Sequence, residues 1–304
     1  MSKVFITGSS GFIGSHICDA LESKGHEVIL YDIISSKYKS ESQKEVLGSI
    51  LDYEKMYNAI EDCDIIYHLA AQADIGQSSI DPSNTLRINI QGTQNILDIA
   101  IKKKISRIIF ASTIYVYSDL GSFYRVSKQA CEKIIEEYQR EFGLDFTILR
   151  FGSLYGPRAN EFNFILNAIT QALRQKKIFR RGDGEEIREY IHVKDAAQLS
   201  VEALNERYRN EHLILTGHQQ TRIKDLLKII AEIFDNDIQI EFGKEKELHH
   251  YEITPYNFKP RIAKKITCQT YYDLGQGILD QVYDLQNKLH QKGSPPIISL
   301  RNLK

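Results

Sequence analysis

Short apolar runs alternate with segments of helical periodicity along the first half of the chain. The runs KVFITG, HEVILYD, CDIIYHLAA, SRIIFAST and DFTILRFGS predict strands at residues 3–8, 26–32, 63–71, 106–113 and 145–153. Between them, apolar spacing predicts helices over residues 12–24, 53–60, 84–103 and 124–141. Strands that are apolar on both faces and alternate with helices are typical of a parallel sheet covered on both sides. Right-handed crossovers then predict a doubly wound α/β sheet.

The pattern changes after about residue 156. A loop leads into a helix over 156–177, a strand and a helix follow over 189–204, and HLILTG predicts a strand that rejoins the main sheet. The segment 221–234 predicts an amphipathic helix, and 237–242 predicts a short strand. This pattern predicts two domains: a Rossmann domain at 1–160, rejoined by 187–217, and a smaller α/β substrate-binding domain at 161–186 and 218–304.

A glycine-rich turn joins the first strand to the first helix. TGSSGFIG places Gly8, Gly11 and Gly14 where a backbone turns tightly, approaches a pyrophosphate and packs its helix against the sheet. The N-terminus of that helix supplies N–H donors and partial positive charge for phosphates. Asp32 ends the next strand, eighteen residues after Gly14. A carboxylate there accepts hydrogen bonds from the adenosine ribose and repels a 2′-phosphate, so NAD is predicted in preference to NADP.

Tyr124 and Lys128 lie four residues apart in SFYRVSKQACEK, on one face of the predicted helix. A free tyrosine, with a pKa of about 10, is a poor base at neutral pH. An ammonium about 4 Å away, in an effective dielectric near 20, favours the phenolate by roughly 4 kcal/mol. That energy predicts a tyrosine pKa of about 7. Taken alone the pair is an ordinary helix surface, so the reactive interpretation depends on the other motifs.

Composition narrows the classes of protein that fit. The 304 residues carry 39 Lys and Arg against 40 Asp and Glu, so no global charge favours nucleic acid or an anionic membrane. No apolar run approaches the ~20 residues of a membrane span, and the N-terminus enters a strand pattern at once, so no signal peptide is expected. Four scattered cysteines without ligand spacing predict reduced thiols, no metal site and a cytoplasmic location.

Eight motifs occur together in one order: TGSSGFIG, LD at Asp52, HLAAQA, RINIQGTQNIL, FASTIYVYS, YRVSK, LRFGSLYGPR and REYIHVKDAA. On these motifs the chain resembles the extended short-chain dehydrogenase/reductase superfamily, in its nucleotide-sugar epimerase/dehydratase branch. The resemblance implies NAD as cofactor and a nucleotide-diphosphate sugar as substrate. It also implies a homodimer that packs the helices around 90–103 and 124–141 into a four-helix bundle. Whether the apolar face of 124–141 meets a second chain or its own sheet stays open.

The resemblance also implies roles for single residues. Thr113 matches the catalytic hydroxyl, with Ser112 as the second choice, Tyr124 matches the general base and Lys128 its partner. The implied cofactor site consists of Gly8, Gly11, Phe12, Ile13, Gly14, Asp32, Leu51, Asp52, Leu69, Ala70, Ala71, Gln72, Asn89, Tyr124 and Lys128. The implied substrate contacts are Ser153, Arg188 at the diphosphate and Arg261 as a second phosphate contact. His68 and His192 match structural positions.

Two departures from the family pattern change the expected substrate site. Thr113 and Tyr124 are only eleven positions apart, so the loop that closes over the sugar in relatives is much shortened. The sugar end is therefore predicted to be more open or to be filled by another segment. The 4,6-dehydratases of this branch carry an Asp-Glu pair after the threonine, where this chain has Ile114 and Tyr115, which argues against water elimination. Whether Tyr115 and Tyr117 face the pocket or the core stays open.

Together these features predict an NAD-dependent nucleotide-sugar epimerase, acting at C4 through a transient 4-keto sugar with Tyr124 as general base. A nucleotide-sugar dehydrogenase or a 4-keto-sugar reductase would use the same residues for a single hydride transfer. The sequence does not separate these activities from epimerisation. A non-catalytic NAD-binding protein is a third interpretation, which the presence of Thr113, Tyr124 and Lys128 disfavours.

Overall fold

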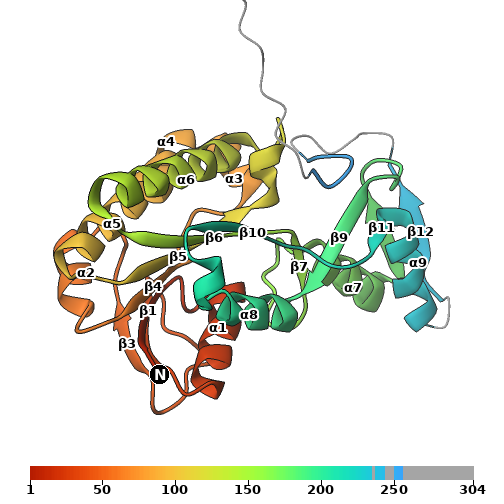
Figure 1. Ribbon diagram of the computed structural model, residues 1–304. Helices are drawn as coiled ribbons and strands as arrows, with labels where there is room; N and C mark the ends of the chain where they lie inside the picture. The colour runs from red at the N-terminus through yellow and green to blue at the C-terminus, as the bar shows by residue number, and fades with distance from the viewer. Residues whose placement is uncertain (235–236, 244–249, 256–304) are drawn as a thin grey trace, which may run out of the picture. The chain divides into compact units, whose positions relative to one another are not determined.

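The computed structural model describes residues 1–234, 237–243 and 250–255 of the chain. The strands of its main sheet are β1 (Lys3–Thr7), β2 (Glu27–Asp32), β3 (Lys44–Leu47), β4 (Ile65–His68), β5 (Arg107–Thr113), β6 (Asp145–Phe151) and β10 (Glu211–Leu215). They lie in the order β10-β6-β5-β4-β1-β2-β3, and every neighbouring pair is parallel (Figure 1). The doubly wound sheet of the Rossmann type is therefore confirmed.

The five strands predicted in the first half of the chain all form, and β10 rejoins the sheet beside β6 as expected. Edge strand β3 was not predicted. Its sequence, KEVL, has only two apolar residues and neither is fully buried, so it lacks the apolar run that identifies the central strands. The edge position explains this composition, because an edge strand needs fewer buried side chains.

Helices cover both faces of the main sheet (Figure 1). One face packs against α1 (Phe12–Ser23) and α8 (Val193–Glu202), and the other against α2 (Tyr53–Ala59), α5 (Gly92–Lys102) and α6 (Ser122–Phe142). Shorter elements join them, namely α3 (Ile75–Ile80), α4 (Pro82–Leu86), the π-helix η1 (Arg87–Gln91) and the 3-10 helices η2 (Ile114–Tyr117) and η3 (Glu206–Tyr208).

The core lies on both sides of the sheet because side chains alternate along each strand. Phe5 of β1 packs with the helices α2, α5 and α6, whereas Val4 and Ile6 pack with α1 and α8. Burying each large apolar side chain of this kind contributes roughly 1.5–3 kcal/mol. The alternation therefore anchors both helical layers to the same strands, and it fixes where the loops after the strands emerge.

Helix α6, which carries Tyr124 and Lys128, begins and ends at glycines. Gly121 has φ +104° and Gly143 has φ +71°, both in the left-handed region that favours glycine. At the C-terminal end, the N–H of Gly143 donates to the carbonyl of Gln139, which is a common way for a helix to stop. The two glycines therefore set the start and the length of the helix that presents the predicted catalytic pair.

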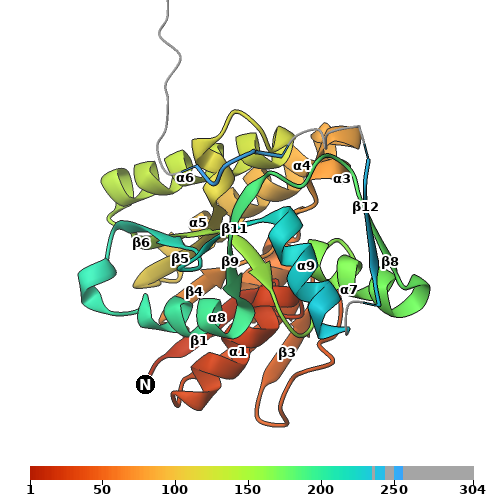
Figure 2. The ribbon, with the colours of Figure 1, turned by 90° about the vertical axis from the view of Figure 1, so that its right-hand side faces the viewer.

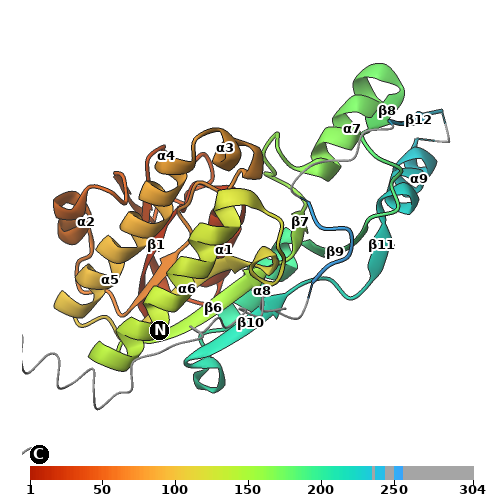
Figure 3. The same cartoon turned by 90° about the horizontal axis from the view of Figure 1, so that it is seen from above.

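A second group of elements lies beside the main sheet (Figures 2 and 3). It contains β7 (Ser153–Tyr155), β9 (Ile187–His192) and β11 (Gln220–Arg222) in the order β11-β9-β7, the pair β8 (Lys177–Arg180) and β12 (Gln239–Phe242), and the helices α7 (Phe164–Gln175) and α9 (Ile223–Ile233). The predicted amphipathic helix and the strand after it are confirmed. The division into two domains stays a prediction, and residues 256–304 of its second range lie outside the described residues.

Candidate active site

The loop after β1 forms a cradle of backbone atoms. Gly8 has φ +73°, and a Cβ on it would lie 2.6 Å from the backbone nitrogen of Ala70. A Cβ on Gly14 would lie 2.0 Å from the carbonyl oxygen of Gly8. Neither position can hold a side chain without a shift of the backbone. A Cβ on Gly11, just before α1, would lie 3.2 Å from the same Gly8 oxygen, which is a much milder contact. The cradle at the N-terminus of α1 therefore fits a pyrophosphate.

Asp32 stands at the end of β2, on the edge of the same pocket. Its Oδ2 accepts a hydrogen bond from the backbone N–H of Ser10 at 2.9 Å, and its Oδ1 accepts one from Ile34 at 3.3 Å. The carboxylate is therefore held by the glycine loop itself. An acid in this place fits the ribose of an NAD adenosine, and its charge opposes a 2′-phosphate.

The pocket at the carboxyl ends of β1, β4 and β5 measures about 650 Å³. Sequence-predicted residues that line it are Gly8, Gly11, Phe12, Ile13, Gly14, Asp32, Leu51, Leu69, Ala70, Ala71, Gln72, Ser112, Thr113, Tyr124 and Lys128. The residues Ile33, Ile50, Ile88, Phe151, Leu154 and Asn160 also line it and were not predicted. Ile33 directly follows Asp32, so its position in the sequence was the one available signal.

Two residues assigned to the cofactor site do not line the pocket. Asp52 is exposed and caps α2, where its carboxylate accepts from the N–H of Lys55 at 3.1 Å. Asn89 is buried inside η1; its side chain exchanges hydrogen bonds with the backbone of Gln72, at 2.8 and 3.1 Å, and donates to Ser127 Oγ at 2.8 Å. Asn89 therefore ties the loop that flanks the pocket to α6, and its π-helical backbone is of a kind frequent at functional sites.

His68, at the end of β4, joins the end of β1 to α5. The Thr93 hydroxyl donates to the carbonyl of Asn89 at 2.6 Å, so its oxygen accepts from His68 Nε2 at 2.9 Å. The Thr7 hydroxyl accepts from the N–H of Ala70 at 3.3 Å and donates to His68 Nδ1 at 2.8 Å. With Nε2 as donor and Nδ1 as acceptor, His68 is the neutral Nε2–H tautomer. Burial, with Lys128 nearby, lowers the pKa of His68 well below its usual value, in agreement.

Tyr124 and Thr113 both line the pocket, and the two side chains interact there. Burial raises the pKa of Tyr124 to about 12, and the neighbouring Thr113 hydroxyl opposes that rise. Lys128 is buried; its ammonium donates to the carbonyl of Ala111 at 2.7 Å and lies 5.9 Å from the centroid of the Tyr124 ring. Burial lowers the pKa of Lys128 to about 8.

The prediction that Lys128 alone brings the pKa of Tyr124 to about 7 is therefore wrong. It assumed an ammonium close to the phenol oxygen and ignored the cost of burying either charge. In the structure the ammonium faces a backbone carbonyl, and the loss of solvation disfavours both the phenolate and the ammonium. Tyr124 consequently needs further positive charge beside it before it can act as a base.

Ser112, the second choice for the catalytic hydroxyl, is committed elsewhere. Its Oγ donates to Glu132 at 2.5 Å, and Glu132 forms a salt bridge with Arg150 at 2.6 Å. Arg150 in turn donates to the hydroxyl of Tyr117 at 2.5 Å, so Tyr117 belongs to this network. The geometry therefore favours Thr113, whose hydroxyl meets Tyr124, over Ser112.

Of the three residues assigned to the substrate, the two that the structure describes are not found among the pocket-lining residues. Ser153 and Arg188 are outside the pocket lining, on β7 and β9, and both contact Tyr251. Arg261 lies outside the described residues. Tyr251 was missed because it is far along the chain from its partners and belongs to no motif.

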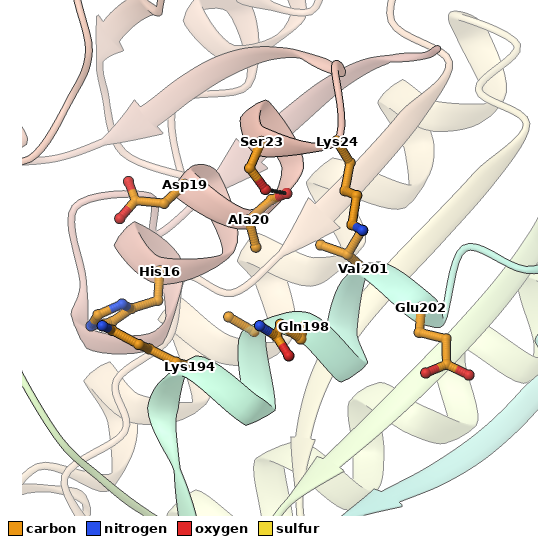
Figure 4. Close-up of a pocket in the computed structure, with 10 residues that line it drawn as sticks. His16, Asp19, Ala20, Ser23, Lys24, Lys194, Gln198, Val201 and Glu202 are labelled. Carbon is orange, nitrogen blue, oxygen red and sulfur yellow. Dashed lines mark hydrogen bonds between the residues drawn. The ribbon is translucent and has the colours of Figure 1, made fainter.

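A second hollow, of about 760 Å³, lies between α1 and α8 (Figure 4). It is lined by side chains from two helix surfaces, with His16 and Lys194 at one end and Lys24 and Glu202 at the other. None of the predicted site residues lines it, and the one hydrogen bond among the residues drawn joins Ser23 to the carbonyl of Ala20. We therefore place the functional site at the glycine loop.

Within the described residues, no group of three or more His, Cys, Asp or Glu could hold a metal ion. No helix in this same part of the chain is both long and apolar enough to cross a membrane.

A parallel sheet with this cradle, an acid ending β2 and a Tyr–Thr–Lys group after β5 defines an NAD-dependent enzyme of the Rossmann class. The sequence profile described as "NAD dependent epimerase/dehydratase family" matches residues 4–215, and the chain belongs to that family. NAD is its cofactor, and the glycine cradle and Asp32 fit it.

The relatives are similar along nearly the whole chain. The UDP-N-acetyl-alpha-D-glucosaminuronate decarboxylase of Bacillus cytotoxicus is 29% identical, over 92% of this chain and 96% of that protein. A putative UDP-glucose 4-epimerase of Methanocaldococcus jannaschii is also 29% identical, over 93% and 98%. Among solved structures, the UDP-glucuronic acid 4-epimerase of Bacillus cereus, in complex with UDP-glucuronic acid and NAD, matches with a TM-score of 0.76 and 25% identity, over 86% of this chain and 95% of that one.

Proposed function

We propose that the protein is an NAD-dependent nucleotide-sugar 4-epimerase. The observation that carries the proposal is that Tyr124 and Thr113 line the cofactor pocket together with Lys128. The positions after Thr113 hold Ile114 and Tyr115, neither of which carries a carboxyl group for the acid–base work of a dehydratase. The relatives that bear epimerase names support the same class of reaction.

In this mechanism Thr113 orients the C4 hydroxyl of the sugar and Tyr124 removes its proton. When bound, NAD supplies a hydride acceptor and, once reduced, a donor that restores C4 after the keto sugar has turned. Because burial keeps the pKa of Tyr124 at about 12, the phenolate needs cationic neighbours. Lys128 is one of them, and the positive nicotinamide ring adds charge of the same sign.

Arg188 is the residue we assign to the diphosphate. It is buried, with 6% of its surface exposed, and it forms no salt bridge with a carboxylate in the described part of the chain. A buried guanidinium without a carboxylate favours an anionic ligand, and its planar fork matches phosphate oxygens. Ser153, which lies on the neighbouring strand, is a second proposed contact.

Decarboxylation of a nucleotide-linked uronic acid is the second candidate. The Bacillus cytotoxicus relative bears a decarboxylase name. The chemistry begins with the same step, because a ketone at C4 lies beta to a C6 carboxylate and so assists loss of CO₂. The two candidates therefore share Tyr124 and Thr113, and differ in whether the keto sugar loses the carboxylate attached to C5 as CO₂ before the hydride returns.

We also propose a homodimer through α5 and α6. On α6, Phe123 and Val126 are 41% and 40% exposed, whereas Ile135 packs in the core of its own sheet. Phe123 and Val126 therefore form an exposed apolar strip on α6 that a second copy of the chain can cover. Light scattering should give twice the chain mass, and Val126→Asp should lower it.

A cytoplasmic location remains part of the proposal, consistent with the free thiols Cys18 and Cys63.

The deciding experiment is proton NMR of the protein with NAD and a panel of UDP-sugars that includes UDP-glucuronic acid. A C4-inverted sugar without accumulated NADH would support the epimerase. A UDP-pentose with released CO₂ would establish the decarboxylase, and a keto sugar with stoichiometric NADH would indicate a dehydrogenase. No turnover of any sugar would contradict the proposal.

A further inference from the structure

The segment 250–255 runs beside β9, far in sequence from the rest of the site (Figure 3). The N–H of Ile187 donates to the carbonyl of Glu252 at 2.8 Å, and Ile187 forms a parallel bridge with Ile253. These backbone contacts hold the segment against the strand that carries Arg188. Its position is therefore defined by the sheet rather than by side chains alone.

Tyr251 lies where three parts of the site meet. Only 5% of its surface is exposed. The Arg188 guanidinium lies 4.2 Å from its ring centroid, and the Tyr115 ring packs against it with centroids 4.7 Å apart. Its hydroxyl interacts with Ser153, which stands between two residues that line the cofactor pocket.

Tyr115 links this segment to the shortened loop between Thr113 and Tyr124. Its hydroxyl is hydrogen-bonded to His250 Nδ1 at 2.6 Å. On its other side its ring lies over Gly121, where a Cβ would come within 2.7 Å of it. Tyr115 is thus packed between Gly121 and the 250–251 segment. The sugar end that the short loop leaves is therefore bounded by another segment, one of the two outcomes expected from the sequence.

The stacking leaves part of Arg188 free to bind. One terminal nitrogen donates to the carbonyls of Ile187 and Glu252, at 3.0 and 3.3 Å. The other two nitrogens donate no hydrogen bond to any described residue. The guanidinium is thus held by the Tyr251 ring on one face and by two backbone carbonyls at one nitrogen. Its remaining N–H groups can donate two parallel hydrogen bonds to phosphate oxygens.

We propose that Tyr251 is a positioning residue for the substrate: its ring fixes the Arg188 guanidinium for the diphosphate. The inference rests on the proposed nucleotide-sugar function. It goes further by making the 250–254 segment, rather than the loop before Tyr124, the determinant of how the diphosphate and sugar are seated.

The test is calorimetric binding of UDP and UDP-glucose to the full-length protein saturated with NAD. Tyr251→Ala should raise the Kd of UDP about tenfold, equal to 1.4 kcal/mol. Tyr251→Phe, which keeps the ring, should change it by less than about threefold. Both variants should bind NAD as the wild type does. Ile253→Ala, on the same segment but 61% exposed, is the matched control and should change nothing.

Coupling between the two side chains gives the sharper measurement. If Tyr251 acts through Arg188, Arg188→Lys should weaken UDP binding less in the Tyr251→Ala background than in the wild type. Additive effects, an unchanged Kd in Tyr251→Ala, or an equal loss in Tyr251→Phe would each overturn the inference alone. Failure of the wild type to bind UDP or UDP-glucose would overturn the proposed function and the inference together.

Discussion

The cofactor end and the substrate end of this protein are built in different ways. On the two faces of the main sheet, the described residues form hydrophobic clusters of twenty-one and seventeen buried side chains, whereas the cluster around α7 and α9 has six. At the cofactor end, backbone excludes side chains at Gly8 and Gly14, and His68 has a hydrogen-bond partner at both ring nitrogens. At the proposed substrate end, Arg188 and Ser153 both contact one tyrosine, Tyr251.

This difference teaches where a substitution should act. A change at the cofactor end disturbs a packed and fully bonded region, so stability and NAD binding should fall together. A change at the substrate end removes a few long-range contacts beside a small core, so substrate affinity should fall alone. The predictions below test this contrast, from the largest expected effect to the smallest.

Tyr124→Phe tests the residue where the two ends meet. Loss of the phenol removes the general base, and we expect the turnover of the preferred sugar to fall about a thousandfold, or roughly 4 kcal/mol. The NAD affinity and the unfolding midpoint should stay close to those of the wild type, since the ring is kept. NMR turnover assays and calorimetry with NAD provide the measurements. Wild-type turnover in this variant would rule out the catalytic assignment.

Gly14→Ala tests the backbone cradle. The added methyl group would lie 2.0 Å from the carbonyl oxygen of Gly8, so the loop must move. We expect a loss of about 3 kcal/mol in the free energy of unfolding, together with loss of NAD binding. Gly11→Ala is the matched control, because its methyl group meets the same oxygen at 3.2 Å and should cost less stability. Equal unfolding free energies for the two variants, measured in urea, would contradict the contrast.

The cofactor end was predictable because its signals are local. The strand, the three glycines and Asp32 lie within the first 32 residues, and each has a physical role that spacing reveals. The pairing of Ser112 with Glu132 was not visible, since it joins a strand to a helix through a contact that no motif encodes. The π-helix at Arg87–Gln91 was also missed, because one wider turn hardly alters the apolar periodicity of the predicted helix over 84–103.

The substrate end was less predictable because its contacts are distant in sequence. Tyr251 meets Tyr115 across 136 positions, and neither carries a pattern that points to the other. The short loop predicted a sugar end that is either more open or filled by another segment, and it did not indicate which segment that would be. The charge argument for Tyr124 failed for a related reason: spacing placed Lys128 on the correct helix face, but burial and the partner of its ammonium are tertiary properties.

Thr93→Val tests the bonding around His68. The substitution removes the only oxygen that accepts from His68 Nε2 among the described residues and leaves a buried N–H unpaired. We expect a loss of about 2 kcal/mol in the free energy of unfolding. Thr85→Val is the matched control: Thr85 is also buried and also donates to the carbonyl four residues back, at 3.0 Å, but it meets no histidine. A similar loss in both variants would show that His68 contributes nothing.

The pH dependence of stability tests whether His68 stays neutral. Burial lowers the pKa of His68 in the folded protein. Below about pH 6.5, His68 therefore binds a proton in the unfolded chain but not in the folded chain. The free energy of unfolding should therefore fall as the pH drops, by about 1.4 kcal/mol per pH unit from this group, and should gain nothing from it at higher pH. His16, His26 and His212 also have lowered pKa values, so the wild-type slope includes them. The measurement is consequently the difference between the wild type and His68→Gln in urea titrations from pH 5 to 8. Parallel curves for the two proteins would mean that His68 has the same pKa in the folded and unfolded chains, which would contradict its burial as a neutral ring.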